Sequence, residues 1–212
     1  MNIYDEIAKV GVVPVVKIED PSAALPLVEA MAKGGIPAAE ITFRTAHALG
    51  AIEAVAKALP EVLVGAGTVT TADQAKAAID AGAKFIVGPG LSAKVAKVCR
   101  NGGVVYLPGC VTPTEIIAAL DEGINIVKFF PASVYGGLKA IKALSAPFGD
   151  VKFLPTGGVN ATNLAEYLSC DRIIACGGSW MAEPSLVREK KFGEIESLCR
   201  EASGIVKAVK IG

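Results

Sequence analysis

The stretch VLVGAGTVTTADQAKAAIDAGAKFIVGP, residues 62–89, decides the fold of this chain. It begins with an apolar run, Val62–Thr68, continues through an Ala-rich segment, Thr71–Ala81, and returns to an apolar run at Phe85–Pro89. Short Val/Ile-rich runs indicate buried strands, whereas the Ala-rich segment opens with a helix-capping threonine and ends before Gly82, a helix-stop residue. A strand–helix–strand unit of this kind places its two strands parallel to each other.

The same alternation extends toward both ends of the chain. The expected strands are Val12–Ile18, Ala39–Phe43, Val62–Thr68, Phe85–Pro89, Val104–Pro108, Ile126–Pro131, Lys152–Thr156 and Arg172–Ala175. The expected helices are Pro21–Lys33, Ala46–Leu59, Thr71–Ala81, Ser92–Asn101, Thr112–Glu122, Leu138–Leu144, Asn163–Leu168 and Leu186–Ser203.

Continuous apolar strands that alternate with helices predict an α/β protein with a parallel sheet covered by helices. No break in composition marks a linker, so residues 1–212 are predicted to form a single domain. Eight strand–helix units favour a closed (β/α)8 TIM barrel. An open doubly wound sheet is the alternative, but the first strand ends Lys17-Ile18-Glu19-Asp20 and lacks a dinucleotide-binding glycine turn. The segment Ile3–Val10 is expected to add a helix that covers the bottom of the barrel.

The charge balance excludes several classes of partner. Basic and acidic residues number 21 each, and no long run of one sign occurs, which argues against nucleic acid or an anionic membrane surface as a partner.

The first residues, Met1-Asn2-Ile3-Tyr4-Asp5-Glu6, carry acidic side chains where a signal peptide has basic ones. No apolar stretch approaches the about 20 residues that span a bilayer. We therefore expect a soluble, cytoplasmic protein.

Cysteine and histidine usage leaves little room for metal chemistry. The five cysteines are odd in number and contain no C-x-x-C pair, which is typical of small buried apolar residues rather than of a disulfide framework or a zinc site. They are Cys99, Cys110, Cys170, Cys176 and Cys199. The only histidine, His47, stands at an expected helix start and is predicted to be exposed or to cap that helix. The sequence therefore predicts no metal site.

One strand carries a lysine in the middle of an apolar run, Ile126-Val127-Lys128-Phe129-Phe130-Pro131. Lysine is almost never buried without a reason, and an unpaired ammonium in an apolar setting tends to lose its proton. A neutral amine can attack a carbonyl group and form a Schiff base. The alternative is that Lys128 stands at a strand end and reaches solvent along its aliphatic stem.

Polar side chains at other strand ends favour the chemical interpretation, because active sites of such barrels lie where strands end. With the strand period of two, Glu40, Thr42 and Arg44 face the same side of the second strand, and Thr68 ends the third. Glu40, Arg44, Thr68 and Lys128 are expected to converge in one barrel mouth. A buried Glu40–Lys128 ion pair without chemistry is the alternative.

Two glycine pairs follow the seventh and eighth expected strands, Gly157-Gly158 and Gly177-Gly178. Glycine lets the backbone approach an anion closely, and backbone N–H groups near a helix start can bind one. The ends of the last two strands are also the usual phosphate site of these barrels. The pairs are therefore predicted to be phosphate-binding turns, although glycine is frequent in ordinary turns as well.

Five segments together resemble the 2-keto-3-deoxy-6-phosphogluconate (KDPG)/4-hydroxy-2-oxoglutarate (KHG) aldolase family, in order over nearly the whole chain. The segments are Glu40-Ile41-Thr42-Phe43-Arg44-Thr45, Gly65-Ala66-Gly67-Thr68-Val69, Lys128-Phe129-Phe130-Pro131-Ala132, Pro155-Thr156-Gly157-Gly158-Val159 and Gly177-Gly178-Ser179-Trp180. The resemblance implies a class I, Schiff-base aldolase on a (β/α)8 barrel, assembled as a homotrimer and without a metal or organic cofactor. The departure is Phe43, where Leu is common, and it is expected to affect only packing.

The resemblance also implies roles for particular residues. Lys128 would form the Schiff base and Glu40 would be the general acid/base. The substrate-binding residues would be Arg44 and Thr68 for the pyruvate carboxylate, Pro89 and Phe130 for the pocket wall, and Thr156, Gly157, Gly158, Gly178 and Ser179 for the phosphate.

The implied reaction is cleavage of KDPG to pyruvate and glyceraldehyde 3-phosphate. A related aldolase for the galactonate epimer or for 4-hydroxy-2-oxoglutarate is an alternative. So are a phosphate-binding barrel that uses Lys128 only electrostatically, and a non-catalytic sensor of a phosphorylated sugar acid. The presence of both Lys128 and Glu40 argues against the sensor, because binding alone does not require a neutral amine.

Overall fold

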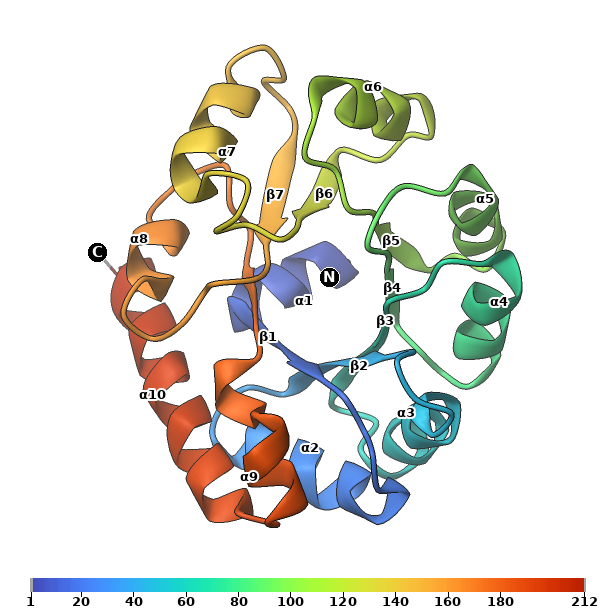
Figure 1. The fold of residues 1–212 in the computed structure, drawn as a ribbon, viewed down its shortest axis with the longest axis vertical. Coiled ribbons are helices and arrows are strands. Elements are labelled where there is room, and N and C mark those ends of the chain that lie inside the picture. Colours follow the sequence, from blue (N-terminus) through green and yellow to red (C-terminus); the bar gives the residue numbers. More distant parts are fainter. Residues whose placement is uncertain (1, 212) are drawn as a thin grey trace.

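Strands and helices alternate along residues 2–211, the part of the chain that the computed structural model describes (Figure 1). The ends of the predicted domain, Met1 and Gly212, lie outside these residues. The strands are β1 (Val12–Val16), β2 (Ala38–Thr42), β3 (Leu63–Gly67), β4 (Phe85–Val87), β5 (Val105–Leu107), β6 (Ile126–Phe129), β7 (Lys152–Pro155) and β8 (Cys176–Gly178). The helices are α1 (Ile3–Val10), α2 (Ala24–Lys33), α3 (Ala48–Ala58), α4 (Ala72–Asp80), α5 (Ala93–Asn101), α6 (Pro113–Asp121), α7 (Gly137–Ser145), α8 (Leu164–Leu168), α9 (Pro184–Arg188) and α10 (Phe192–Ile211), with 3-10 turns η1 (Pro21–Ala23) and η2 (Trp180–Ala182).

All strand pairs are parallel. Six strands form one sheet in the order β5-β4-β3-β2-β1-β8, and β6 pairs with β7. Isolated parallel bridges lie between the two sheets, at Gly109–Lys128, Phe153–Ile173 and Thr156–Gly177. Apart from α1, the helices lie outside the strands in Figure 1. The predicted α/β class with parallel strands and alternating helices is confirmed.

Local sequence signals explain where several helices begin. Thr71 Oγ1 accepts a hydrogen bond from the Gln74 N–H at 3.2 Å, and Thr112 Oγ1 accepts one from the Glu115 N–H at 3.3 Å. The side chains of Gln74 and Glu115 in turn accept hydrogen bonds from the backbone N–H groups of Thr71 and Thr112, which completes a capping box at each helix. Within residues 2–211, no helix is both long and apolar enough to cross a membrane.

Two buried apolar clusters hold the layers together. The larger one joins helices to the outward side of the strands. The smaller one joins strand residues to one another and to Ile7 of α1, including Ala38, Leu63 and Phe85 at the amino ends of β2, β3 and β4. The predicted N-terminal helix is therefore confirmed, and it covers the amino ends of the strands. Figure 1 shows α1 behind the strands, in the middle of the view.

The single helix predicted over Leu186–Ser203 is wrong. The structure has a short helix, α9, and a long one, α10, that continues to Ile211. Lys190 adopts a left-handed backbone conformation, φ 54°, between them. A left-handed residue ends a helix, because the regular bonding pattern stops there. No proline interrupts the sequence between Leu186 and Ser203, so the helical pattern does not reveal this break.

The strand predicted over Arg172–Ala175 is also displaced. The regular ladder with β1 begins at Cys176, which pairs with Val12, and runs to Gly178, which pairs with Pro14. Residues 172–174 touch β7 only through an isolated bridge. Strand boundaries depend on the partner strand, which lies far away in the sequence.

Candidate active site

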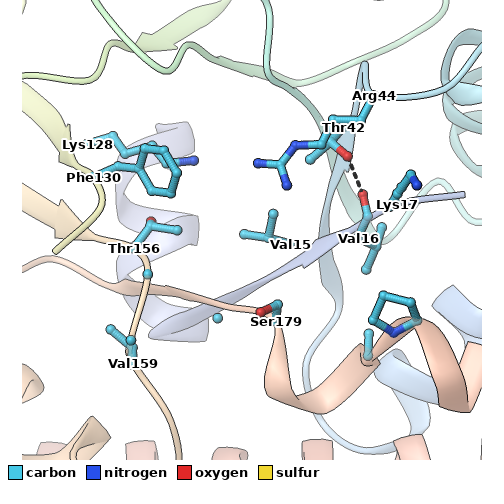
Figure 2. Close-up of a pocket in the computed structure, with 15 residues that line it drawn as sticks. Val15, Val16, Lys17, Thr42, Arg44, Lys128, Phe130, Thr156, Val159 and Ser179 are labelled. Carbon is cyan, nitrogen blue, oxygen red and sulfur yellow. Dashed lines mark hydrogen bonds between the residues drawn. The ribbon is translucent and has the colours of Figure 1, made fainter. Parts of the chain in front are cut away.

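A cavity of about 250 Å³ opens at the carboxyl ends of the strands, opposite the ends that α1 covers (Figure 2). It is lined by Val15, Val16, Lys17, Thr42, Arg44, Lys128, Phe130, Thr156, Gly157, Gly158, Val159, Gly178, Ser179, Ala182 and Pro184. Eight of the eleven residues predicted for the site are among them. Glu40 and Thr68 contact lining residues from outside the cavity wall. Pro89 follows β4, is exposed and does not line the cavity.

Lys128 and Glu40 form a buried pair beside this cavity. Lys128 Nζ lies 3.1 Å from Glu40 Oε1 and 3.4 Å from Oε2, and the two residues are 5% and 2% exposed. The Lys128 backbone is held on one side, where its N–H donates to the Pro108 carbonyl and its own carbonyl accepts from Cys110. The Phe130 ring centroid is 5.3 Å from Nζ. The amine is thus oriented toward the cavity with a proton-accepting carboxylate in contact.

Gly67 makes room for the Glu40 carboxylate, a role that was not predicted from the sequence. A Cβ atom at residue 67 would lie 2.7 Å from Glu40 Cγ and 2.8 Å from Cδ, too close for any side chain. Gly67 pairs with Thr42 in the β2–β3 ladder and accepts a hydrogen bond from Phe43 N–H, so its backbone is held in place. Glycine inside a strand often marks a close approach of this kind, and that signal was available in the sequence.

Arg44 presents a second cation to the cavity. Its Nε donates to Thr68 Oγ1 at 3.2 Å, and its guanidinium points toward the middle of the cavity in Figure 2. Thr68 has a left-handed backbone, φ 56°, which is unusual for a β-branched residue and marks functional sites when the surroundings impose it. Thr42 Oγ1 donates to the Val16 carbonyl at 2.9 Å and ties the ends of β2 and β1 together. The free edge of the guanidinium suits a carboxylate, which it can bind through two hydrogen bonds.

The wall opposite Arg44 is formed by Thr156, Gly157, Gly158, Gly178 and Ser179, and we call it the cradle. Gly157 and Gly158 have φ values of 92° and 80°, which only glycine adopts readily. Among the hydrogen bonds within residues 2–211, none uses the N–H of either glycine. Thr156 Oγ1 is buried without a hydrogen-bond partner in the same range, and the Ser179 hydroxyl faces the cavity (Figure 2). Unused donors of this kind fit an anion such as phosphate.

Gly177-Gly178 was predicted to be a turn, and this is wrong, because both residues belong to β8. Glycine is needed here for packing. A Cβ at residue 177 would lie 2.9 Å from Thr156 Cγ2, and one at residue 178 would collide with the Trp180 ring. Gly178 nevertheless lines the cavity, so its position at the cradle does not depend on the turn.

The charge of the lining residues is positive. Lys17, Arg44 and Lys128 line the cavity, and no carboxylate is among its lining residues. Lys17 stands at the end of the first expected strand, and no role was predicted for it from the sequence. His47 is exposed, as predicted. Within residues 2–211, no cluster of three or more His, Cys, Asp or Glu side chains is placed to hold a metal ion.

These features define an α/β protein whose site combines a lysine amine, a buried carboxylate and two separate anion-binding walls. The chain belongs to the KDPG and KHG aldolase family, whose sequence profile matches residues 3–198. The family assignment expected from the sequence is thereby confirmed.

Three relatives illustrate the similarity. The 2-dehydro-3-deoxy-phosphogluconate aldolase of Treponema pallidum is 43% identical over 97% of this chain and 98% of its own. A KDPG aldolase structure from Legionella pneumophila, with pyruvate captured as a covalent carbinolamine intermediate, is 36% identical, covers 94% of this chain and 97% of its own, and has a TM-score of 0.90. The Zymomonas mobilis enzyme with 3-phosphoglycerate is 38% identical over 96% of both chains, with a TM-score of 0.87.

Proposed function

We propose that this protein is a class I aldolase that cleaves KDPG to pyruvate and glyceraldehyde 3-phosphate through a Schiff base on Lys128. The observation that carries the proposal is the buried contact of 3.1 Å between Lys128 Nζ and Glu40 Oε1 beside a cationic cavity. The carbinolamine in the Legionella structure, a covalent adduct of pyruvate, supports it by similarity.

The mechanism follows from the two side chains. Lys128 attacks the C2 ketone of the substrate, and Glu40 carries protons while the carbinolamine forms and loses water. Glu40 then removes the proton of the C4 hydroxyl, the C3–C4 bond breaks, and its electron pair moves toward the iminium nitrogen. The products are an aldehyde and an enamine. Protonation at C3 and hydrolysis of the iminium release pyruvate and restore the lysine.

The cavity walls supply binding for the two ends of the substrate. Arg44 and Thr68 hold the carboxylate in this proposal, and Phe130 packs against the reacting carbons. The phosphate end would be held by Thr156, Gly157, Gly158, Gly178 and Ser179. The unused N–H groups of Gly157 and Gly158 and the unpartnered Thr156 hydroxyl support this assignment. No metal or organic cofactor takes part in any step.

The substrate alternatives differ in support. The curated relative and both structures named above carry names of the gluconate series, which favours KDPG over its galactonate epimer. The family also includes KHG aldolases, so 4-hydroxy-2-oxoglutarate, cleaved to pyruvate and glyoxylate, is a second proposed substrate. Pyruvate release from each candidate, measured with purified protein, discriminates among the three.

Borohydride trapping tests the mechanism directly. Pyruvate with borohydride should inactivate the protein and add one reduced adduct to Lys128, located by peptide mass spectrometry. Lys128→Ala should abolish turnover, and Lys128→Arg should not restore it, because a guanidinium stays protonated and cannot attack. Lys152, exposed at the start of β7, is the matched control and should remain unlabelled. An adduct on another lysine, or none, would overturn the proposal.

We also propose that the two sheets close into a complete (β/α)8 barrel. The bridges Gly109–Lys128, Phe153–Ile173 and Thr156–Gly177 and the enclosed apolar cluster support closure. Slow hydrogen exchange at the Lys128 and Ile174 amides would agree with it, and rapid exchange at both would contradict it.

A homotrimer in the cytoplasm is the predicted state of the protein. Light scattering should give a mass three times the 21.7 kDa of one chain. Cell fractionation should place the protein with cytoplasmic markers.

A further inference from the structure

Lys17 is the lining cation that the mechanism above does not use. It follows β1, where Val15 points into the cavity, and the strand alternation puts Lys17 on the same side as Val15. Figure 2 shows both among the residues around the cavity. Lys17 also borders a neighbouring hollow of about 280 Å³ together with Pro184 and Arg188. Its side chain therefore stands at the mouth of the site.

The ion pair between Lys17 and Glu19 is exposed, which allows the Lys17 ammonium to move. Lys17 Nζ lies 2.7 Å from Glu19 Oε1, and both side chains are 41% exposed. Exposed pairs of this kind contribute little to stability. The other Glu19 oxygen, Oε2, lies 3.8 Å from Arg188 Nη1, so Glu19 keeps a cation when Lys17 leaves. The flexible four-carbon stem of lysine allows such an exchange without backbone movement.

The phosphate end of the cavity lacks any other available cation among its lining residues. In the proposed function the free edge of Arg44 binds the substrate carboxylate, and Lys128 is bound to Glu40 and forms the Schiff base. The cradle itself offers only backbone N–H groups and hydroxyls. A phosphate group carries nearly two negative charges and forms its strongest hydrogen bonds with cationic donors.

We propose that Lys17 is a further substrate-binding residue, whose ammonium leaves Glu19 to bind the substrate phosphate while Arg188 retains Glu19. This assignment rests on the proposed aldolase function and extends its phosphate site. Lys17 then determines the preference for phosphorylated over unphosphorylated substrates.

The test compares kcat/KM for KDPG and for unphosphorylated 2-keto-3-deoxygluconate. Lys17→Met should lower the ratio of the two values by about 10- to 100-fold, the range for a hydrogen bond to a charged group, mainly through KM for KDPG. The inhibition constant of inorganic phosphate should rise in parallel. Lys17→Arg should retain most of the preference. Lys152→Met changes an exposed lysine at the amino end of β7, the end that faces away from the cavity, and should leave the ratio unchanged.

The Glu19→Gln variant tests whether Lys17 moves from Glu19 to the substrate phosphate or stays in a fixed ion pair with Glu19. Without its competitor, Lys17 is free for the phosphate, so KM for KDPG should fall. A rise in KM as large as that of Lys17→Met would overturn the exchange, and an unchanged ratio in Lys17→Met would overturn the role of Lys17. Adduct formation by the wild-type protein with pyruvate tests the aldolase function separately. Its absence would refute that function, whereas a normal adduct with an unchanged ratio refutes only Lys17.

Discussion

A single methyl group at Gly67 should disable the site without touching substrate. The added Cβ would lie 2.7 Å from Glu40 Cγ and 2.8 Å from Cδ, where ordinary contacts begin at 3.4 Å. The β3 backbone cannot retreat freely, because Gly67 accepts the hydrogen bond of Phe43 N–H at 2.8 Å. Glu40 must therefore move by roughly 1 Å, a misplacement that can cost about 10²-fold in rate.

We expect Gly67→Ala to lower kcat by about 10²-fold, since the Glu40 carboxylate loses its contact with Lys128 Nζ. Overpacking should also cost about 1–3 kcal/mol of unfolding free energy, measured by urea titration. The matched control is Gly50→Ala in α3, where a Cβ meets nothing within 4 Å. It should keep full activity and gain up to about 1 kcal/mol from helix propensity.

The assay combines steady-state pyruvate release with borohydride trapping on the same samples. The Glu40→Asp change shortens the carboxylate side chain. The double variant Gly67→Ala/Glu40→Asp should lose less kcat than the sum of the losses, in free energy, of the two single variants, because both changes act on one contact. A folded Gly67→Ala protein with wild-type kcat and normal adduct formation would refute the reasoning. Strict additivity would show that Gly67 acts elsewhere.

Further predictions concern the remaining groups. Glu40→Gln should stay folded by circular dichroism and lower kcat by about 10²–10⁴-fold, and normal turnover would limit Glu40 to a charge partner. Ser179→Ala should cost KDPG more than its unphosphorylated analogue in kcat/KM, whereas equal losses would argue against a phosphate contact. A chelator should leave activity unchanged, and loss with EDTA would indicate a metal-dependent aldolase. Burial raises the pKa of the Cys110 and Cys199 thiols from 9.0 to about 12. Above about pH 9 the unfolded chain therefore binds fewer protons than the folded one, so urea unfolding should show stability falling between pH 9 and 12, and a flat profile would contradict the shift.

The order of the strands and the identity of the central pair could be predicted without the structure. The capping threonines Thr71 and Thr112 mark helix starts because they bond to residues three positions away, so the signal is local. Lys128 and Glu40 could be singled out because a charged residue inside an apolar strand needs a partner or a task. Their strand faces follow from a period of two, which requires no knowledge of the partner strand.

The sequence predicted that Glu40 and Lys128 converge, but their contact distance and the room for it depend on the tertiary structure. Glu40 and Lys128 lie 88 positions apart, and their contact depends on the packing of β2, β3 and β6 around Gly67. The same packing places Gly178 within β8 rather than in a turn and leaves Pro89 exposed beyond the cavity. A sequence pattern reports the period of one segment, whereas distances between segments depend on side-chain volumes and backbone ladders contributed by several of them.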